Sequence, residues 1–251
     1  VFDTTFHSTM PPKAFMYGIP YEVYERFKVR KYGFHGTSHK FVSEETAKIL
    51  GTENCRLIIC HLGNGSSISA VKDGKCQDTS MGFTPLEGLV MGTRSGDIDP
   101  SIVTYLMEQE GYTPNEIITI LNRQSGLYGI SGISADMRDI DAATKSGLKR
   151  AALAYDMFAN SAKKMIGSYM AEMGGVDMII FTGGVGENSC EMREAVCTGL
   201  EFMGVKFDPA ANKGVRGVNK ILSAADSKVK VATIATNEEL VIATDTYNLV
   251  K

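Results

Sequence analysis

The clearest hydrophobic pattern in the 251-residue sequence is a four-residue apolar run, Leu57–Cys60, that leads into a glycine-rich segment, His61–Ser67. An alternating run follows in which Ile68 and Ala70 are separated by a serine, and it ends near Asp73–Gly74. A short continuous apolar run is typical of a buried strand, and Asp-Gly between two such runs is a strong hairpin signal. The pattern therefore predicts a buried strand, a glycine-rich turn and a β-hairpin.

A second combination of strand and glycines lies in the last third of the chain. The apolar segment Asp177–Phe181 runs into the glycine-rich segment Thr182–Ser189, and Lys228–Ile234 is another strand-sized run. Apolar residues at helical spacing predict further helices, the longest over Ala151–Met173. Three strands in a row, followed by helices alternating with two strands, predict an α/β fold with a mixed sheet. We expect a ribonuclease H-like βββαβαβα unit with a helical insertion.

Capping residues predict where several helices begin. Thr37 or Ser38 can cap a helix that runs to Leu50, and Asp99–Pro100 is expected to begin another. The inner face of that second helix is expected to comprise Ile102, Val103, Leu106 and Met107. Residues 81–100, which precede it, show little periodicity, and irregular segments of this length are often functional.

Polar residues flanked by glycine are the candidates for anion binding. Gly63 and Gly65 leave backbone N–H groups open to an anion, although an ordinary Gly-Asn-Gly turn fits these residues equally well. His35 lies in a glycine-flanked turn before a predicted helix N-terminus, where anions are favoured. Arg94 lies among glycines in the irregular segment. The glycines that follow the predicted strand Asp177–Phe181 match neither a Walker A loop nor a dinucleotide-binding fingerprint.

Three acidic positions have a structural interpretation beside a functional one. Asp3 follows a short apolar start, which suits either chemistry at a strand end or the cap of a helix or turn. The segment Asp136–Arg138 is more typical of a salt-bridged helix start than of a ligand site. Glu238 lies in the first turn of a predicted terminal helix, where the helix dipole alone accounts for a carboxylate.

Composition excludes some classes of function. The net charge is −3 and the charges are mixed, so no basic stripe indicates nucleic acid and no polybasic arm indicates a membrane surface. The longest apolar runs are strand-sized, far short of a membrane span. Five cysteines without a CxxC pair predict free thiols in a reducing cytoplasm. The first residue is Val1 rather than Met, and we expect the chain to be a piece of a longer protein.

Seven motifs together resemble the acetokinase family, within the superfamily that contains actin, hexokinase and Hsp70. They occur in the family's order from one end of the chain to the other, and the set is highly specific although no single motif is decisive. In this sequence they are VFDT at 1–4, YGFHGTSH at 32–39, HLGNG at 61–65, MGTRSGD at 91–97, DMR at 136–138, FTGGVGEN at 181–188 and TNEE at 236–239.

The resemblance implies reversible, Mg²⁺-dependent transfer of the ATP γ-phosphoryl group to acetate, giving acetyl phosphate and ADP, in a homodimeric cytoplasmic enzyme. The family's catalytic positions correspond here to Asp3, His35 and Arg94. A magnesium-associated glutamate corresponds to Glu238, and a small apolar pocket for the acyl methyl corresponds to Phe34 and Pro85. The family's nucleotide-binding positions correspond to His61, Leu62, Gly63, Asn64, Gly65, Asp136, Met137, Arg138, Gly184, Val185, Gly186, Glu187 and Asn188.

The match departs from the family pattern because the N-terminal half-domain, with its Asn-Ala-Gly-Ser-Ser strand and its carboxylate-binding arginine, is missing. We expect residues 1–8 to be a remnant of that domain, 9–236 to form the nucleotide-binding domain, and 237–251 to be a helix that would pack on the missing part. That helix would then expose Leu240, Val241 and Tyr247. The isolated chain is expected to bind adenine nucleotide weakly without turning over acetate. The alternatives are a propionate or butyrate kinase, a non-catalytic nucleotide-binding module, and a structural domain that binds no nucleotide.

Overall fold

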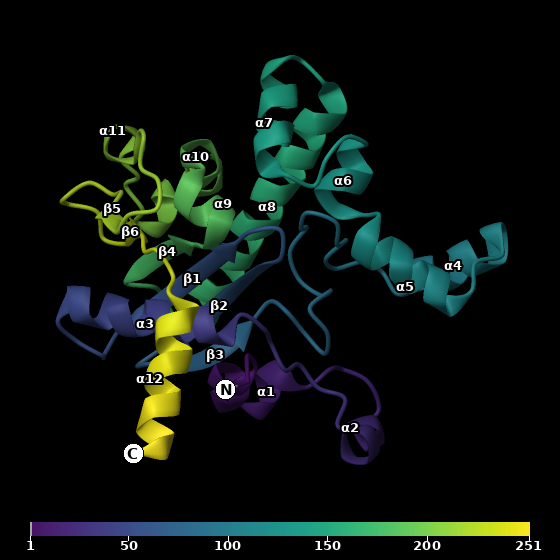
Figure 1. Ribbon diagram of the computed structural model, residues 1–251, viewed down its shortest axis with the longest axis horizontal. Coiled ribbons are helices and arrows are strands. Elements are labelled where there is room, and N and C mark those ends of the chain that lie inside the picture. The colour runs from purple at the N-terminus through teal and green to yellow at the C-terminus, as the bar shows by residue number, and fades with distance from the viewer. Residues whose placement is uncertain (1) are drawn as a thin grey trace.

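A six-stranded sheet with helices on both faces forms the centre of the molecule (Figure 1). The computed structural model describes residues 2–251, so Val1 of the predicted N-terminal segment lies outside the described residues. The strands are β1 Arg56–Leu62, β2 Ser66–Lys72, β3 Lys75–Thr79, β4 Met178–Thr182, β5 Lys220–Ile221 and β6 Lys230–Thr233. The helices are η1 Thr5–Thr9, α1 Pro12–Phe15, α2 Tyr21–Phe27, α3 Gly36–Leu50, α4 Ser101–Glu110, α5 Pro114–Arg123, α6 Gly126–Ser131, α7 Met137–Lys145, α8 Lys149–Glu172, α9 Gly183–Asn188, α10 Cys190–Cys197, η2 Glu201–Met203, α11 Pro209–Asn212 and α12 Glu238–Val250.

The sheet is mixed, with the strand order β3-β2-β1-β4-β6-β5. Strands β1, β2 and β3 pair antiparallel, whereas β4 and β6 run parallel to β1, and β5 is an antiparallel edge strand. The predicted α/β fold class, with three consecutive strands followed by alternating helices and strands, is therefore confirmed. The two-residue edge strand β5 is an addition that the sequence pattern did not indicate.

The hairpin between β2 and β3 follows from its turn residues. Asp73 and Gly74 both have positive φ angles, 52° and 72°, which is the conformation that a two-residue type I′ turn requires. The serines of β2 are buried along with its apolar residues, because the sheet is covered on both faces. Ser69, for example, lies 2.8 Å from the Thr79 hydroxyl on β3.

Two hydrophobic cores lie on opposite faces of the sheet, because successive side chains of a strand point to opposite faces. One core comprises Ile58 and Cys60 of β1 with Phe158 and Ile166 of α8. The other core comprises Leu57 and Ile59 of β1 with Val42 of α3. Helices α8 and α3 therefore cover opposite faces of the sheet, and they leave the turns at the ends of its strands uncovered.

The predicted inner face of α4 is wrong. No residue of α4 is buried: Ile102 is 42% exposed, and Val103, Leu106 and Met107 are only half-buried. Figure 1 shows α4 and α5 extending away from the sheet, so the apolar side of α4 does not meet the core. Helix α5 begins at a capping box formed by Thr113 and Glu116.

The terminal helix α12 begins after the Asn237 cap, which accepts a hydrogen bond from the Leu240 N–H. Leu240 and Tyr247 are exposed as predicted, whereas Val241 is buried. Val241 is covered because α12 packs on α3, where the Lys40 ammonium lies 2.8 Å from the Asp245 carboxylate. The five cysteines are free thiols, as predicted. No helix within residues 2–251 is both long and apolar enough to cross a bilayer.

Candidate functional site

The two glycine-rich segments meet at one edge of the sheet. His61 at the end of β1 pairs with Thr182 at the end of the parallel strand β4, so both strands deliver their following turns to the same place. The approach is close, because a Cβ added to Gly183 would lie 2.9 Å from the Leu62 carbonyl oxygen. A Cβ added to Gly63 would lie 3.9 Å from the Gly184 nitrogen. The structure therefore brings these predicted nucleotide-binding segments together.

The N-terminus of α3 is capped by a residue distant in sequence. The Asp3 carboxylate accepts hydrogen bonds from the backbone N–H of His35, at 2.6 Å, and of Thr37, at 3.3 Å. The Asp3 carbonyl accepts a third from Gly36 at 2.9 Å. Neither Thr37 nor Ser38 caps the helix through its own side chain, so that prediction is wrong. Of the two interpretations of Asp3, the cap is the one that its contacts display.

His35 and Arg94 border the same space beside the first glycine-rich turn. A Cβ added to Gly65 would lie 3.1 Å from Arg94 Nη1 and 3.4 Å from His35 Nε2. Arg94 donates to the Pro85 carbonyl at 3.2 Å, and within residues 2–251 no carboxylate lies within ion-pair distance of it. Burial lowers the pKa of the Arg94 guanidinium from its usual range. A half-buried cation without an anion therefore faces a bare glycine backbone, an arrangement suited to a phosphate.

All four histidines of the chain form one continuous cluster. The rings of His35 and His61 stack with centroids 4.2 Å apart, and His61 Nδ1 lies 2.8 Å from the Ser38 hydroxyl. His39 and His7 extend the cluster inward, with their ring centroids 5.5 Å apart. Burial lowers the pKa of His7 to about 4 and that of His61 to about 3. These rings are neutral at pH 7. No local signal pointed to His39, which is fully buried behind the site.

The second glycine-rich segment is helical rather than a loop, and its polar side chains form hydrogen bonds within the protein. Glu187 Oε1 accepts hydrogen bonds from the Gly183 N–H at 3.0 Å, the Thr182 hydroxyl at 3.3 Å and the Thr236 N–H at 3.1 Å. Asn188 donates to the Gly184 carbonyl at 2.9 Å. The backbone at Gly184 is exposed and is open to a ligand, because an added Cβ there would meet nothing within 4 Å.

The Asp136–Arg138 segment is a salt-bridged helix start. Asp136 caps α7, and its carboxylate lies 2.5 Å from the Arg138 guanidinium, which holds the pKa of Asp136 down to about 2. Met137, like Leu62, is buried in the core, so its side chain is not available to a ligand. The segment still lies near the first turn, because a Cβ added to Gly92 would lie 1.8 Å from Asn64 Oδ1 and 3.2 Å from the Ala135 carbonyl.

The two predicted acyl-pocket residues both accept hydrogen bonds through their backbone carbonyls. The half-buried Phe34 accepts a hydrogen bond from His7 Nε2 at 3.0 Å, and Pro85 accepts the one from Arg94. Burial, and then the negative charge of Asp3, raise the pKa of Glu238. No group of three or more potential metal ligands occurs in the described part of the chain.

The chain matches the family model described as "Acetokinase family" over residues 1–244. The chain belongs to the acetokinase family. It is 63% identical to an acetate kinase of Thermoanaerobacter pseudethanolicus, a match that covers all of this chain and 63% of that protein. The crystal structure of Porphyromonas gingivalis acetate kinase superposes with a TM-score of 0.98 at 50% identity, over 100% of this chain and 63% of that one. A propionate kinase of Francisella tularensis superposes with a TM-score of 0.92 at 46% identity, over 98% and 62%.

This acetokinase chain also contains a buried cation that its sequence did not reveal. Arg193 of α10 is fully buried and has no carboxylate partner within residues 2–251. Its guanidinium donates to the carbonyls of Gly186 and Val215, both at 2.9 Å, and to Asn212 Oδ1 at 2.8 Å. An arginine in the middle of an amphipathic helix gives no sequence signal for this role. Arg193 ties the end of α9, and with it the second glycine-rich segment, to the loop after α11.

We expect Arg193→Met to lower the free energy of unfolding by about 3 kcal/mol, because it removes the arginine donors from three oxygen acceptors, of which the Val215 carbonyl keeps only the weak thiol donor of Cys190. Arg216→Met is the matched control: it removes an exposed arginine from the same loop region and should change stability by less than about 0.5 kcal/mol. Urea unfolding followed by circular dichroism measures both. Equal midpoints for the two variants would show that Arg193 does not hold this region.

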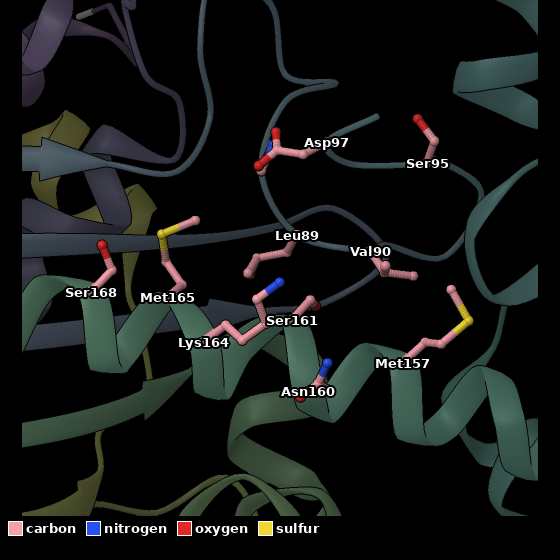
Figure 2. Close-up of a pocket in the computed structure, with 11 residues that line it drawn as sticks. Leu89, Val90, Ser95, Asp97, Met157, Asn160, Ser161, Lys164, Met165 and Ser168 are labelled. Carbon is pink, nitrogen blue, oxygen red and sulfur yellow. The ribbon is translucent and has the colours of Figure 1, made fainter. Parts of the chain in front are cut away.

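The surface also has hollows away from this site. One cavity of about 380 Å³ lies between α8 and the 88–97 segment, and a larger one of about 770 Å³ lies beside α3. Figure 2 shows Leu89, Val90 and Asp97 facing Ser161 and Lys164 across the first cavity. None of the predicted site residues lines either cavity. The candidate site is instead an open edge bordered by His35, Arg94 and the two glycine-rich segments.

Proposed function

We propose that this chain carries the nucleotide-binding and phosphoryl-stabilising part of an enzyme that transfers the ATP γ-phosphoryl group reversibly to acetate, giving acetyl phosphate and ADP. The observation that carries the proposal is that the Arg94 guanidinium and His35 Nε2 both lie beside the bare backbone at Gly65. Phosphoryl transfer spreads negative charge over equatorial oxygens, so positioned cations and donors supply most of its catalysis.

Asp3 has a positioning role in this proposal. An acetate nucleophile is already ionised at neutral pH, so the enzyme needs no base to deprotonate it. The Asp3 carboxylate instead accepts hydrogen bonds from the backbone N–H groups of His35 and Thr37, and so fixes the position of His35 at the N-terminus of α3. Glu187 acts in the same way on the second glycine-rich segment, through its bonds to Gly183 and Thr236.

The residues present fit a Mg²⁺ ion that arrives with the nucleotide. Burial, and then the negative charge of Asp3, raise the pKa of Glu238, and Mg²⁺ in kinases is commonly bound by one or two carboxylates together with phosphates and water. Bound there, the ion would neutralise charge on the transferring phosphate. Asp3 and Glu238 would hold it, directly or through its water ligands.

The acyl group is the least constrained part of the proposal. The structural match to a propionate kinase makes propionate the second candidate substrate. Phe34 and Pro85 are proposed to line the acyl pocket from this side, where both are half-buried beside the cluster. A non-catalytic nucleotide-binding module is less well supported, because simple nucleotide binding needs neither the unpaired Arg94 nor His35.

The chain spans about 63% of the length of the curated relatives it matches. We propose that residues 9–236 form the nucleotide-binding domain and that residues 237–251 pack on a further domain of the complete protein, which would be a cytoplasmic homodimer. The exposed apolar side chains of α12 support this: they are Leu240, Ile242, Tyr247, Leu249 and Val250.

Calorimetry and a hydroxamate assay test the proposed function together. The 251-residue chain should bind ATP and ADP, with binding strengthened by Mg²⁺, and should produce no acetyl phosphate from acetate and ATP. The complete gene product should produce acetyl phosphate from acetate, and should produce propionyl phosphate from propionate more slowly. A chain that binds no nucleotide would refute the proposed site, whereas acetyl phosphate synthesis by the 251-residue chain would refute the need for a further domain.

A glycine-to-alanine substitution, which adds one methyl group, tests whether the first glycine-rich turn contacts the phosphates. The backbone at Gly65 is outside the left-handed region, so Gly65→Ala should fold normally while its Cβ enters the space beside Arg94 and His35. We expect kcat of the complete gene product to fall by about tenfold or more, because 1 Å misplacements at such sites carry costs of this order. Gly18→Ala is the control, since a Cβ there meets nothing within 4 Å. An unchanged kcat in Gly65→Ala would place the phosphates elsewhere.

A further inference from the structure

The two ring nitrogens of His35 face different surroundings. Nδ1 points back into the protein, 2.9 Å from the Ser67 hydroxyl on β2. Nε2 is on the side of Gly65 and Arg94, and no hydrogen bond joins it to another described residue. His35 therefore meets any anion in the site with Nε2, and it is held from behind through Nδ1.

The same Ser67 hydroxyl serves a second histidine. His39 Nε2 lies 2.8 Å from Ser67 Oγ, and both residues are fully buried. A hydroxyl has one proton to donate, so between two neutral imidazoles it donates to one and accepts from the other. The direction of this short relay decides which nitrogen of His35 carries the proton.

The far nitrogen of His39 sets the direction. His39 Nδ1 is buried and has no hydrogen-bond partner. If His35 donated from Nδ1 to Ser67, then Ser67 would donate to His39 Nε2, and His39 would carry a buried N–H with no acceptor. Orphaned buried N–H groups are rare, and unfilled acceptors are tolerated better. The opposite direction leaves only a lone pair at His39 Nδ1.

From this geometry we infer that Ser67 and His39 are positioning residues that hold His35 in the tautomer with its proton on Nε2. His39 Nε2–H donates to Ser67, the Ser67 hydroxyl donates to His35 Nδ1, and His35 Nε2–H is left to donate into the space beside Gly65 and Arg94.

The tautomer matters because His35 is neutral. Burial lowers the pKa of His35; the negative charge of Asp3 opposes this shift, and the positive charge of Arg94 adds to it. A neutral imidazole donates from one nitrogen only, so the other tautomer would present a lone pair to a phosphate and repel it. What the Nε2–H meets rests on the proposed function, whereas the tautomer itself does not.

Nitrogen NMR of the ¹⁵N-histidine-labelled 251-residue chain reads the tautomer directly. The chain has four histidines, so four ring spin systems are expected, and single His→Gln variants assign them. At pH 7.5 His35 should show a protonated Nε2 and an Nδ1 shifted by an accepted hydrogen bond. Ser67→Ala should populate the Nδ1–H tautomer as well. Ser69→Ala, a buried serine on the same strand whose hydroxyl lies against Thr79, should leave the His35 signals unchanged.

A second pair of variants keeps the test independent of how Ser67→Ala folds. His39→Gln retains an amide donor for Ser67 and should keep the Nε2–H tautomer, whereas His39→Leu removes the donor and should mix the tautomers. A proton on Nδ1 in the unsubstituted chain would overturn the inference. So would a single Nε2–H tautomer retained in Ser67→Ala or His39→Leu, whatever the activity.

Kinetics on the complete gene product then separate the inference from the proposed function. Ser67→Ala should lower kcat by about 10- to 100-fold, the range typical of residues that orient a functional histidine, with little change in KM for ATP. A shifted tautomer in a gene product without acetate or propionate kinase activity would refute the proposed function and leave the tautomer inference standing. A shifted tautomer with unchanged kcat would show that His35 does not donate to the transferring group.

Discussion

Replacing Arg94 with alanine should lower kcat of the complete gene product by about 10³-fold or more, while ATP binds nearly as tightly as before. Arg94 is the one side chain in the site that is half-buried, cationic and without an anionic partner among residues 2–251. Its contact with the Pro85 carbonyl uses only part of the planar donor fork. The remaining donors are therefore preorganised for charge that develops on the transferring phosphoryl group.

Two control variants make this result specific to Arg94: a lysine at the same position, and an alanine in place of a distant arginine. Arg94→Lys keeps the charge but loses the fork, so it should recover only part of the lost rate. Arg123→Ala removes an exposed arginine at the end of α5 and should leave kcat unchanged. Hydroxamate assays over a range of ATP concentrations separate kcat from KM. A kcat for Arg94→Ala within tenfold of the unsubstituted enzyme would remove Arg94 from the transition state.

Local patterns were enough to predict the strands of the sheet other than β5. The continuous apolar run before His61 predicted β1, and the run that ends at Phe181 predicted β4, because each strand is buried on both faces and needs no alternation. Asp73–Gly74 predicted the hairpin because few other dipeptides adopt two consecutive positive φ angles. Once these strands pair in parallel, the two glycine-rich segments must lie together. The location of the site therefore follows from local signals.

The contacts that organise the site could not be predicted, since each joins residues far apart in the chain. Asp3 caps a helix that begins at Gly36, and Ser67 bridges His35 and His39. Periodicity also cannot tell which amphipathic helix meets the core, and for this reason the inner face of α4 was wrong. The predicted roles of Glu187 and Asp136 illustrate the same limit, because their carboxylates are engaged within the protein.

The buried histidine cluster should make the folded state sensitive to acid between pH 6.5 and 4. Burial lowers the pKa of His7 to about 4 from a normal value near 6.5, so in this range the unfolded chain binds a proton that the folded chain does not. Stability is therefore fully present above pH 6.5 and is lost as the pH falls. His7 alone accounts for about 3 kcal/mol over this range, at 1.36 kcal/mol per pKa unit. His39 and His61 act in the same direction.

Urea unfolding at pH 7.5, 6.5, 5.5 and 4.5 measures this loss, and His7→Gln isolates one member of the cluster. Glutamine can still donate to the Phe34 carbonyl but does not titrate, so the variant should be less stable at pH 7.5 and yet lose about 1.4 kcal/mol less per pH unit below pH 6. The carboxylates cannot mimic this difference, because they are the same in both chains. Identical pH slopes for the two chains would mean that His7 has the same pKa in the folded and unfolded chains, and that its burial does not make the fold sensitive to acid.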